Sequence, residues 1–357
     1  MSGSADLPSE DQPDFPASEA NRCEPAGFSH VPVMASEITA VFADVPAGYV
    51  LDATLGGGGH AQLLLEAHPH LSILGMDRDE TALEAAGRRL APYSGRVKTV
   101  HGRFDHLRDA MKSSDITRLS GALFDLGVSS PQLDRTERGF SYRHEATLDM
   151  RMDVSESRTA ADIVNEYSET DLARMLADNG DERFAGRIAR SIVSQRPITT
   201  TTRLAEVIVA AIPAAARRTG GHPAKRSFQA IRIEVNRELE ILPGAIDQAI
   251  AETTVGGRIA VLSYHSGEDR IVKQRLRSAE TGDCLCPPGL PCVCGAVRMV
   301  RLVRRVPKSP TSEEVAGNRR AASARLRVAE RIGDTDRSGG LHRGSNETDH
   351  NADKRGA

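Results

Sequence analysis

The feature that most constrains this chain is the run Leu51-Asp52-Ala53-Thr54-Leu55-Gly56-Gly57-Gly58-Gly59-His60. An apolar stretch from Tyr49 ends in an acid, turns through four glycines and enters an apolar-periodic segment over residues 61–67. This order predicts a strand, a tight loop and a helix. Glycines let the backbone approach a ligand closely, and a helix N-terminus offers free N–H groups. The run therefore predicts a site for a carboxylate or a phosphate, with a plain glycine-rich turn as the alternative.

A second acid narrows the choice of ligand. Residues 72–77 have the pattern of a buried strand that ends in Asp77, and an acid about twenty residues past such glycines can bind the ribose hydroxyls of an adenosine cofactor. The run does not fit G-x-G-x-x-G cleanly, and the first strand already ends in Asp52. No G-x-x-x-x-G-K-[ST] motif occurs, which argues against a P-loop nucleotidase. The pattern favours S-adenosylmethionine over NAD.

Strand and helix patterns alternate from residue 49 to about residue 130, which predicts a parallel sheet with right-handed crossovers. Val97–His101 and Gly121–Asp125 are the expected third and fourth strands. Only helical patterns follow until residue 252, and strand patterns return at Arg258–Tyr264 and at Met299–Val306, the expected final strand. The expected helices are residues 61–67, 80–90, 106–111, 169–179, 182–195, 202–212, 227–242 and 268–278. The predicted class is α/β, a Rossmann-like sheet that would hold S-adenosylmethionine, with an inserted all-helical domain.

Charge is unevenly distributed along a chain whose formal net charge is only −3. Residues 183–237 hold eleven Lys and Arg against two Glu, and residues 298–331 hold ten against three Glu. Such blocks indicate a surface that faces a polyanion, with solvated helix faces as the alternative. No apolar run approaches the ~20 residues of a membrane span, and no secretory leader pattern opens the chain. We therefore expect a cytoplasmic protein without a membrane partner.

These patterns predict the following domain limits. Residues 28–132 and 253–332 form the Rossmann-like domain, and residues 133–252 form the inserted helical domain that would hold RNA. Residues 1–27 carry six acids and one Arg with little apolar content, and residues 333–357 are polar. Both terminal segments are expected to be disordered tails.

The fourth strand leads into Asp125-Leu126-Gly127-Val128-Ser129-Ser130-Pro131-Gln132. An acid and a polar turn at a strand end would lie beside the reactive end of the cofactor. Methyl transfer to an exocyclic amine needs such groups, because the amine lone pair is delocalised into the ring. Oxygen acceptors on the N–H hydrogens localise that pair. The alternative is an Asx turn that caps the next segment.

The fifth strand leads into Ser263-Tyr264-His265-Ser266-Gly267-Glu268-Asp269-Arg270. A histidine there can bind phosphate, orient a base or shuttle a proton. Alternatively, Ser266 caps the following helix, with Glu268 and Asp269 in its first turn. The two interpretations are compatible.

Four cysteines fall within eleven residues, at Cys284, Cys286, Cys292 and Cys294. In a cytoplasmic chain this cluster indicates a zinc knuckle before it indicates a disulfide. The C-x-C spacing is tighter than the usual C-x₂-C, so a reduced, solvent-facing loop is the alternative. Cys23, in the acidic tail, is expected to be inert.

Together these residues resemble the RsmH (MraW) family of bacterial 16S rRNA cytosine-N4 methyltransferases, over roughly Phe28 to Ile332. The motifs that carry the resemblance, in chain order, are His-Val-Pro-Val-Met at 30–34, the run at 52–60, Asp-Leu-Gly-Val-Ser-Ser at 125–130, Gly-Phe-Ser at 139–141, Leu-Asp-Met-Arg-Met-Asp at 148–153, Phe-Gln-Ala-Ile-Arg-Ile at 228–233, residues 263–270, and Ala-Arg-Leu-Arg at 324–327. The chain departs from the family at Gly267, where Leu is usual, at Arg319, where Pro is usual, and at Tyr264, where Phe is common. None of these departures touches the expected cofactor pocket.

The resemblance implies a Rossmann-like methyltransferase with a helical insertion that acts on a cytidine in the P-site decoding region of 16S rRNA. It implies that Gly58, Gly59 and His60 line the methionine end of S-adenosylmethionine and that Asp77 takes the ribose. It also implies that Phe104 lies against the adenine, while Asp125 and Gln132 complete the pocket.

The hypothesis is therefore N4 methylation of an rRNA cytidine that is flipped or unpaired. Asp125 is the first candidate to polarise the amine, and Ser129, Asp149 and His265 are weaker candidates. Asp149 begins the insertion and could fold over the site. The partner is expected to be 16S rRNA within the small ribosomal subunit, and the oligomeric state stays open, a homodimer included. The rival classes are an NAD-dependent oxidoreductase and a non-catalytic RNA-binding factor.

Overall fold

The computed structural model describes residues 32–127, 136–218, 221–287 and 292–336, without the side chains of 218, 320 and 334–336. The expected N-terminal tail lies outside these residues. The C-terminal tail was expected to begin at residue 333, but residues 333–336 form the end of strand β7. Residues 337–357 lie outside the described residues.

A seven-stranded sheet in the order β3-β2-β1-β4-β5-β7-β6 forms the centre of the α/β part. Its strands are β1 Gly48–Asp52, β2 Leu71–Asp77, β3 Val97–His101, β4 Leu119–Asp125, β5 Thr253–Ser263, β6 Val297–Leu302 and β7 Arg325–Asp336. The first five strands pair in parallel, and β7 pairs antiparallel with both β5 and β6. The order reverses between β1 and β4. In open α/β sheets a ligand binds outside the carboxyl ends of strands at such a switch point.

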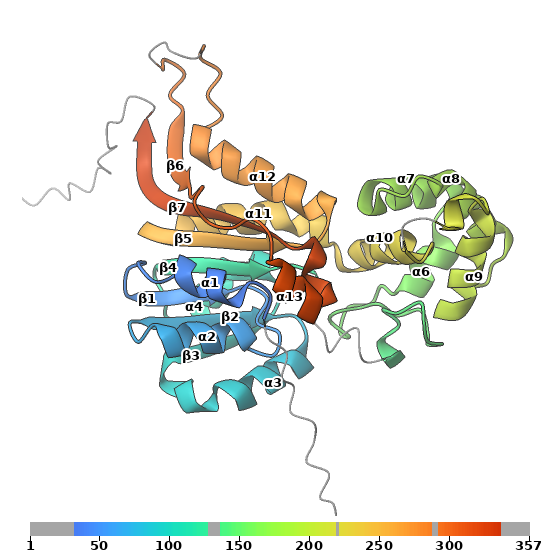
Figure 1. The fold of residues 1–357 in the computed structure, drawn as a ribbon, viewed down its shortest axis with the longest axis horizontal. Coiled ribbons are helices and arrows are strands. Elements are labelled where there is room, and N and C mark those ends of the chain that lie inside the picture. The colour runs from blue at the N-terminus through green and yellow to red at the C-terminus, as the bar shows by residue number, and fades with distance from the viewer. Residues whose placement is uncertain (1–31, 128–135, 219–220, 288–291, 337–357) are drawn as a thin grey trace, which may run out of the picture. The chain divides into compact units, whose positions relative to one another are not determined.

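Apolar residues alternate between the two faces of the sheet, so that each face has its own core. Val50, Ile73 and Leu123 pack with α1 Ala35–Val41, α2 Gly59–Ala67 and α3 Glu80–Leu90. Their chain neighbours Leu51, Leu74 and Phe124 pack on the other face with α4 Leu107–Ser113, α11 Glu238–Glu252 and α12 Ser266–Thr281. Figure 1 shows these helices around the sheet. The layers therefore follow from the two-residue period of strands whose two faces are both buried.

The helical insertion has a separate core. It contains α6 Ala160–Glu166, α7 Glu169–Gly180, α8 Ala185–Ser194, α9 Thr201–Ala211 and α10 Lys225–Asn236. Apolar residues of all five helices form one buried cluster, which includes Ile163, Leu176, Ile188, Ile208 and Ile231. Polar side chains stabilise several helix starts: Thr159 and Asp162 make a capping box at α6, and Ser168 and Thr200 cap α7 and α9.

Short elements complete the described chain. They are α13 Ser312–Gly317 and the 3-10 turns η1 Ala91–Arg96, η2 Phe104–His106, η3 Thr136–Arg138, η4 Ala216–Arg218 and η5 Arg319–Ser323. Among the described helices, none has both the length and the apolar character that crossing a membrane requires.

Two element predictions were wrong. The expected helix at residues 227–242 is broken by Arg237, whose φ of 53° ends α10 and precedes α11. Helix α11 then packs with the sheet, because Ile246, Ala249 and Ile250 lie in the core of the α/β part. The expected final strand at 299–306 is observed as β6, Val297–Leu302, and it is not the last strand, because β7 follows it. Strand β7 was not predicted, because charged residues interrupt its apolar pattern.

Candidate functional site

Three acids mark the carboxyl ends of neighbouring strands at the switch point. Asp52 ends β1, Asp77 ends β2 and Asp125 ends β4. Asp52 is opposite Gly75 in β2 and opposite Leu123 in β4 in the ladder register. The sequence predicted acids at these strand ends, and the parallel register brings them to one edge of the sheet.

The glycine loop joins this edge to the start of α2. Gly56 and Gly58 have φ of 52° and 76°, a region in which a side chain is strained. The Gly56 N–H donates to Asp77 Oδ2 at 2.8 Å, and the Asp79 N–H donates to Oδ1 at 2.9 Å. Burial raises the pKa of Asp77, and these two backbone hydrogen bonds oppose that rise. Asp77 is thus held in a fixed orientation, and each oxygen keeps a lone pair for a ligand.

His60, in the first turn of α2, faces Asp125 across the site. Its Nε2 lies 3.6 Å from Asp125 Oδ2, and its side chain is 6% exposed. Within the described part of the chain, neither ring nitrogen of His60 has a hydrogen-bond partner. Buried polar atoms are rarely left in this state, so the ring is placed to meet a group that the described part of the chain does not provide.

Asp125 is oriented by two neighbours. Its backbone N–H donates to Thr54 Oγ1 at 2.7 Å, and its Oδ1 accepts from the Tyr264 hydroxyl at 2.6 Å. Burial and the charge of Asp125 raise the pKa of Tyr264, so this hydroxyl stays protonated and keeps donating. The Asp125 side chain is still 27% exposed, with Oδ2 on the His60 side. One carboxylate oxygen is anchored while the other stays accessible. The expectation that Tyr264 does not touch the cofactor pocket was therefore wrong, because its hydroxyl contacts Asp125.

Asp52 is a further ionisable group in this cluster that the sequence reasoning used only as a strand end. Its side chain is buried, and the Thr54 N–H donates to its Oδ1 at 3.3 Å. Burial raises the pKa of Asp52 to about 7, although His60 and the Thr54 hydrogen bond pull it down. A carboxyl of this kind changes charge near neutral pH and responds to a cation placed beside it.

Two weaker candidates are engaged elsewhere. Asp149 makes a two-point ion pair with Arg151, with Nε–Oδ1 and Nη2–Oδ2 distances of 2.8 Å. Burial alone would raise the pKa of Asp149, but the hydrogen bonds from Arg151 bring that pKa below its ordinary value. His265 is the N-cap of α12 and accepts the Glu268 N–H at Nδ1, which is the place expected for Ser266. Ser266 instead begins the helix and donates to Asp181. The catalytic roles of Asp149 and His265 stay predictions.

The remaining predicted residues are placed as follows. Gly58 is the N-cap of α2, and Gly59 is its first residue. Phe104 is buried after β3, with its ring edge-to-face against Phe124 at a centroid distance of 5.8 Å. Ser129 and Gln132 lie outside the described residues.

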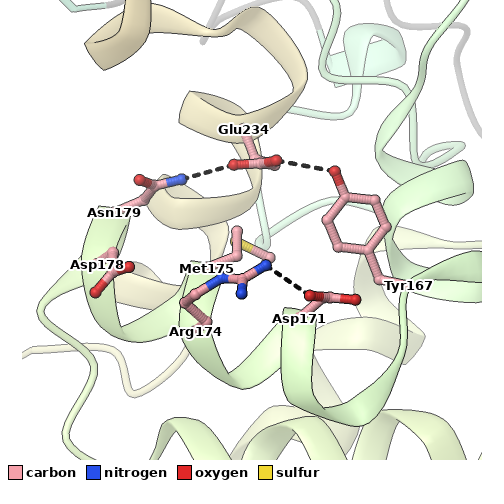
Figure 2. Close-up of a pocket in the computed structure, with 7 residues that line it drawn as sticks. All are labelled: Tyr167, Asp171, Arg174, Met175, Asp178, Asn179 and Glu234. Atoms are coloured by element: carbon pink, nitrogen blue, oxygen red, sulfur yellow. Dashed lines mark hydrogen bonds and ion pairs between the residues drawn. The ribbon is translucent and has the colours of Figure 1, made fainter.

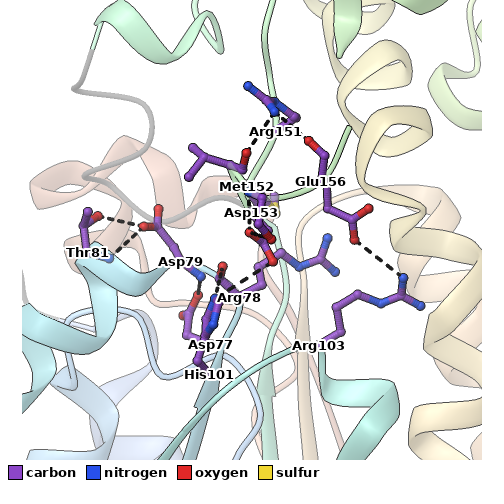
Figure 3. A network of polar contacts seen from close by, with 12 residues as sticks. Asp77, Arg78, Asp79, Thr81, His101, Arg103, Arg151, Met152, Asp153 and Glu156 are labelled. Atoms are coloured by element: carbon purple, nitrogen blue, oxygen red, sulfur yellow. Dashed lines mark hydrogen bonds and ion pairs between the residues drawn. The ribbon is translucent and has the colours of Figure 1, made fainter. Parts of the chain in front are cut away.

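Polar contacts connect the end of β2 to the insertion, and Figure 3 shows part of this network. Arg138 donates to Asp79 Oδ2 at 3.2 Å and to the carbonyls of Arg151 and Met152. On the same side, His101 Nε2 lies 3.9 Å from Asp153 Oδ2. Sequence reasoning missed Arg138 because no local pattern marks a residue whose partners are distant in the chain. The Asp77–Asp79 turn is therefore held by the insertion as well.

Buried Asn236, the last residue of α10, holds the same segment from the other side. It donates to the Met150 carbonyl and accepts from the Met152 N–H, both at 2.8 Å. Its own carbonyl accepts from Arg78 Nη1 at 3.0 Å. Residues 150–152 are thus fixed between α10 and the end of β2.

A group of cations lies where the insertion meets the start of α12. Ser266 contacts Asp181, whose carbonyl accepts from Arg226 at 3.0 Å. Arg183 and Lys225, adjacent in sequence to this contact, are exposed. Many other cations of the basic blocks form ion pairs or hydrogen bonds within the fold. Examples are Arg232 and Arg327, which make bidentate ion pairs with Glu238 and Asp269. Only part of each basic block is therefore available to a polyanion.

A separate hollow of about 300 Å³ lies within the insertion, and Figure 2 shows its lining. Glu234 accepts from the Tyr167 hydroxyl at 2.8 Å, from Asn179 at 3.0 Å and from Arg158 at 2.8 Å. These bonds join α7 and α10 across the hollow. They give Glu234 a structural role in the insertion.

The sequence matches the MraW methylase family model over residues 27–332. A Thermobifida fusca protein named ribosomal RNA small subunit methyltransferase H is 53% identical over 310 residues, which are 85% of this chain and 93% of that protein. A Saccharopolyspora erythraea protein of the same name is 51% identical over the same shares. A solved rRNA methylase from Streptococcus thermophilus aligns with a TM-score of 0.36 and 13% identity over 84% of this chain and 93% of that one, too low a score to add to the sequence match. The chain belongs to the MraW methylase family.

Proposed function

We propose that this protein is an S-adenosylmethionine-dependent methyltransferase that acts on 16S rRNA, at the N4 amine of a cytidine in the P-site decoding region. The family match and the relatives named ribosomal RNA small subunit methyltransferase H support the reaction and the substrate class. The single structural observation that carries it is the Asp125 carboxylate at the switch point, held by Tyr264 and faced by His60.

The site fits S-adenosylmethionine in three respects. Asp77 would offer its two fixed carboxylate oxygens to the ribose hydroxyls. A Cβ built on Gly57 meets no described atom within 4 Å, which leaves open space beside the glycine loop. The two ring nitrogens of His60 also lack hydrogen-bond partners in the described part of the chain. We assign Gly58, Gly59, His60 and Asp77 to the cofactor, with Phe104 on the adenine side; when bound, the cofactor supplies an activated methyl group.

The protein's own contribution to the chemistry centres on Asp125. Its accessible Oδ2 would accept a hydrogen bond from the cytidine amine and localise the nitrogen lone pair, an electrostatic contribution that needs a fixed acceptor. The Tyr264 hydrogen bond to Oδ1 holds that acceptor in place. The amine loses a proton when it is methylated, and Asp125 is the nearest candidate to receive it, either directly or through water.

RNA would contact the exposed cations near Asp181, including Arg183 and Lys225, through its phosphates. Such contacts position the substrate without reading its sequence, and they weaken as salt rises. The target base must leave any paired stack, because the N4 amine is otherwise inaccessible. We further propose that the substrate is presented within the small ribosomal subunit in the cytoplasm. A homodimer stays a prediction.

Nucleoside mass spectrometry would test the assignment. Small ribosomal subunits from a strain that lacks this enzyme would be incubated with purified protein and S-adenosylmethionine. The expected result is new N4-methylcytidine, which Asp125→Ala eliminates. Bound cofactor without methylated cytidine would refute the rRNA assignment. Methylation that persists in Asp125→Ala would refute the role of that carboxylate only.

Two further experiments distinguish a methyltransferase from the rival classes, an NAD-dependent oxidoreductase and a non-catalytic RNA-binding factor. S-adenosylhomocysteine should raise the melting temperature of the protein, and NAD should not. RNA binding should survive Asp125→Ala, whereas methylation should not. A non-catalytic factor would show no methylation to lose.

A further inference from the structure

The four cysteines lie between the end of α12 and the start of β6, a segment that methyl transfer does not use. The Cys284 Sγ lies 3.6 Å from that of Cys292 and 3.5 Å from that of Cys294, and the last two are 3.5 Å apart. All four sulfurs, including that of Cys286, lie within 4.8 Å of one another. A disulfide needs about 2.05 Å between sulfurs. Four sulfurs at about 2.3 Å from one tetrahedral ion lie about 3.8 Å apart, so the spacing suits a shared ion.

Apolar packing does not account for this convergence. Between Gly282 and Gly295, none of the described side chains is buried. The two large apolar residues that the structure describes in this segment, Leu285 and Val293, are 91% and 89% exposed. A short segment without a core needs another source of stability, and a bound metal can supply it.

The two ends of the cysteine segment, at Gly282 and Val297, lie close together. Gly282 ends α12 with φ of 62°, and a Cβ there would lie 2.5 Å from the Val297 carbonyl oxygen, so the helix and β6 approach closely. Within the loop, the Val293 N–H donates to Cys286 Sγ at 3.4 Å. An N–H donor to sulfur stabilises a thiolate, which is the form that binds metal. The backbone therefore already presents the two C-x-C pairs to each other.

We propose that Cys284, Cys286, Cys292 and Cys294 bind one structural zinc ion. Four sulfur ligands in a closed tetrahedral set suit zinc and leave no open position for a substrate. Divalent iron is the other sulfur-binding candidate, and zinc is favoured because it binds such sites more tightly. The loop is also remote from Asp125, because the 16 residues of α12 separate it from the strand ends, about 24 Å at 1.5 Å per residue. The ion orders the α12–β6 connection and takes no part in methyl transfer.

Elemental analysis of the purified full-length chain is the direct test. It should find about one zinc per chain, since thiolate sites of this kind retain zinc through purification. Each of Cys284→Ser, Cys286→Ser, Cys292→Ser and Cys294→Ser should reduce the zinc content at least several-fold. Cys23→Ser, the matched control at the remaining cysteine, should leave it unchanged. Cobalt added to metal-free protein should give thiolate-to-cobalt charge-transfer absorption.

Two measurements keep the test decisive if a variant misfolds. Far-UV circular dichroism reports whether the rest of the chain is intact. In the wild-type protein, a mercurial thiol reagent should release the zinc as it titrates the cysteines. A wild-type chain that carries no zinc, that carries iron instead, or whose intact mass shows two disulfides would overturn the proposal. None of these outcomes bears on the methylation activity, so the two proposals fail independently.

Discussion

At the scale of single residues, Asp125 is defined by what surrounds it. Thr54 holds its backbone and Tyr264 holds one carboxylate oxygen, which leaves the other oxygen beside His60. In this arrangement Asp125 is the group proposed to take part in the reaction, and Tyr264 is the group that orients the Asp125 carboxylate. Substitutions at Asp125 and Tyr264 should therefore have different consequences.

Asp125→Asn should lower kcat for methylation by about 10²–10³-fold, because the amide presents an N–H where an acceptor is needed. Tyr264→Phe should lower kcat by no more than about tenfold, since it removes one orienting hydrogen bond worth about 1 kcal/mol. Single-turnover rates with saturating RNA and cofactor would measure both, and the affinity for S-adenosylhomocysteine would serve as the control. Equal losses in the two variants would contradict the separation of roles.

Asp52 should make stability depend on pH. Burial raises its pKa from 3.8 to about 7, so the folded state keeps a proton that the unfolded state releases. The stabilisation is complete below the unfolded pKa and is lost as pH rises toward the folded pKa. From about pH 5 to pH 8, the free energy of unfolding should fall by roughly 2–3 kcal/mol in the wild type relative to Asp52→Asn. Urea denaturation of the ligand-free proteins would measure this, and parallel pH profiles would exclude it.

At the scale of elements, the glycine loop combines backbone conformation with space for a ligand. Gly58 has φ of 76°, and a Cβ there would lie 3.2 Å from Leu90. Gly57 has no described atom within 4 Å of its Cβ position. Gly58 is therefore required by the fold, and Gly57, which precedes it, borders open space for a ligand that would also lie against Gly58 and Gly59.

Gly57→Ala and Gly58→Ala should separate these two roles. Gly58→Ala should lower the free energy of unfolding by about 1–2 kcal/mol, the cost of a side chain in the left-handed region. Gly57→Ala should leave the ligand-free melting temperature unchanged and weaken S-adenosylhomocysteine binding at least several-fold. Calorimetry of unfolding and of binding would measure both effects. Unchanged binding in Gly57→Ala would place the cofactor away from this loop.

The same elements show what the sequence could predict. The six expected strands and most helices are present, because a two-residue or 3.6-residue apolar period is local and strong in them. Strand β7 was missed because Arg325, Arg327 and Arg331 interrupt its apolar residues. Those side chains donate to Ser309, Asp269 and the Met299 carbonyl, respectively. The break at Arg237 was missed because a left-handed arginine has no sequence signal.

The candidate site was predictable to a similar extent. The acids at strand ends and the glycine loop follow from the rule that ligands bind at the carboxyl edge of parallel strands. The hydrogen bonds of Asp125 to Thr54 and Tyr264, and the use of His265 as a cap, depend on side-chain directions. Sequence patterns carry no information on those directions. Phe104 came from the resemblance alone.

At the scale of the whole molecule, the insertion and the sheet are connected at the edge where the parallel strands end. Arg138 reaches Asp79, Arg78 reaches the Asn236 carbonyl, and Ser266 reaches Asp181. Exposed Arg183 is two residues from Asp181, and exposed Lys225 precedes Arg226, which donates to the Asp181 carbonyl. A phosphate backbone held there would lie beside the strand end that carries His265, so substrate binding and cofactor binding would share one edge of the protein.

Replacing Arg183 and Lys225 together by Gln should weaken RNA binding at physiological salt and spare the cofactor. Each phosphate contact contributes about 0.7–0.9 to the slope of log affinity against log salt, so the double variant should reduce that slope by about 1.4–1.8 if each cation meets one phosphate. Fluorescence anisotropy of an RNA fragment across a salt series would measure the slope. Arg88→Gln combined with Lys112→Gln, at exposed cations on α3 and α4, makes the same charge change of −2 and is the control. An equal reduction in the control would mean that net charge alone attracts the RNA, and an unchanged slope in the double variant would place the RNA on another surface.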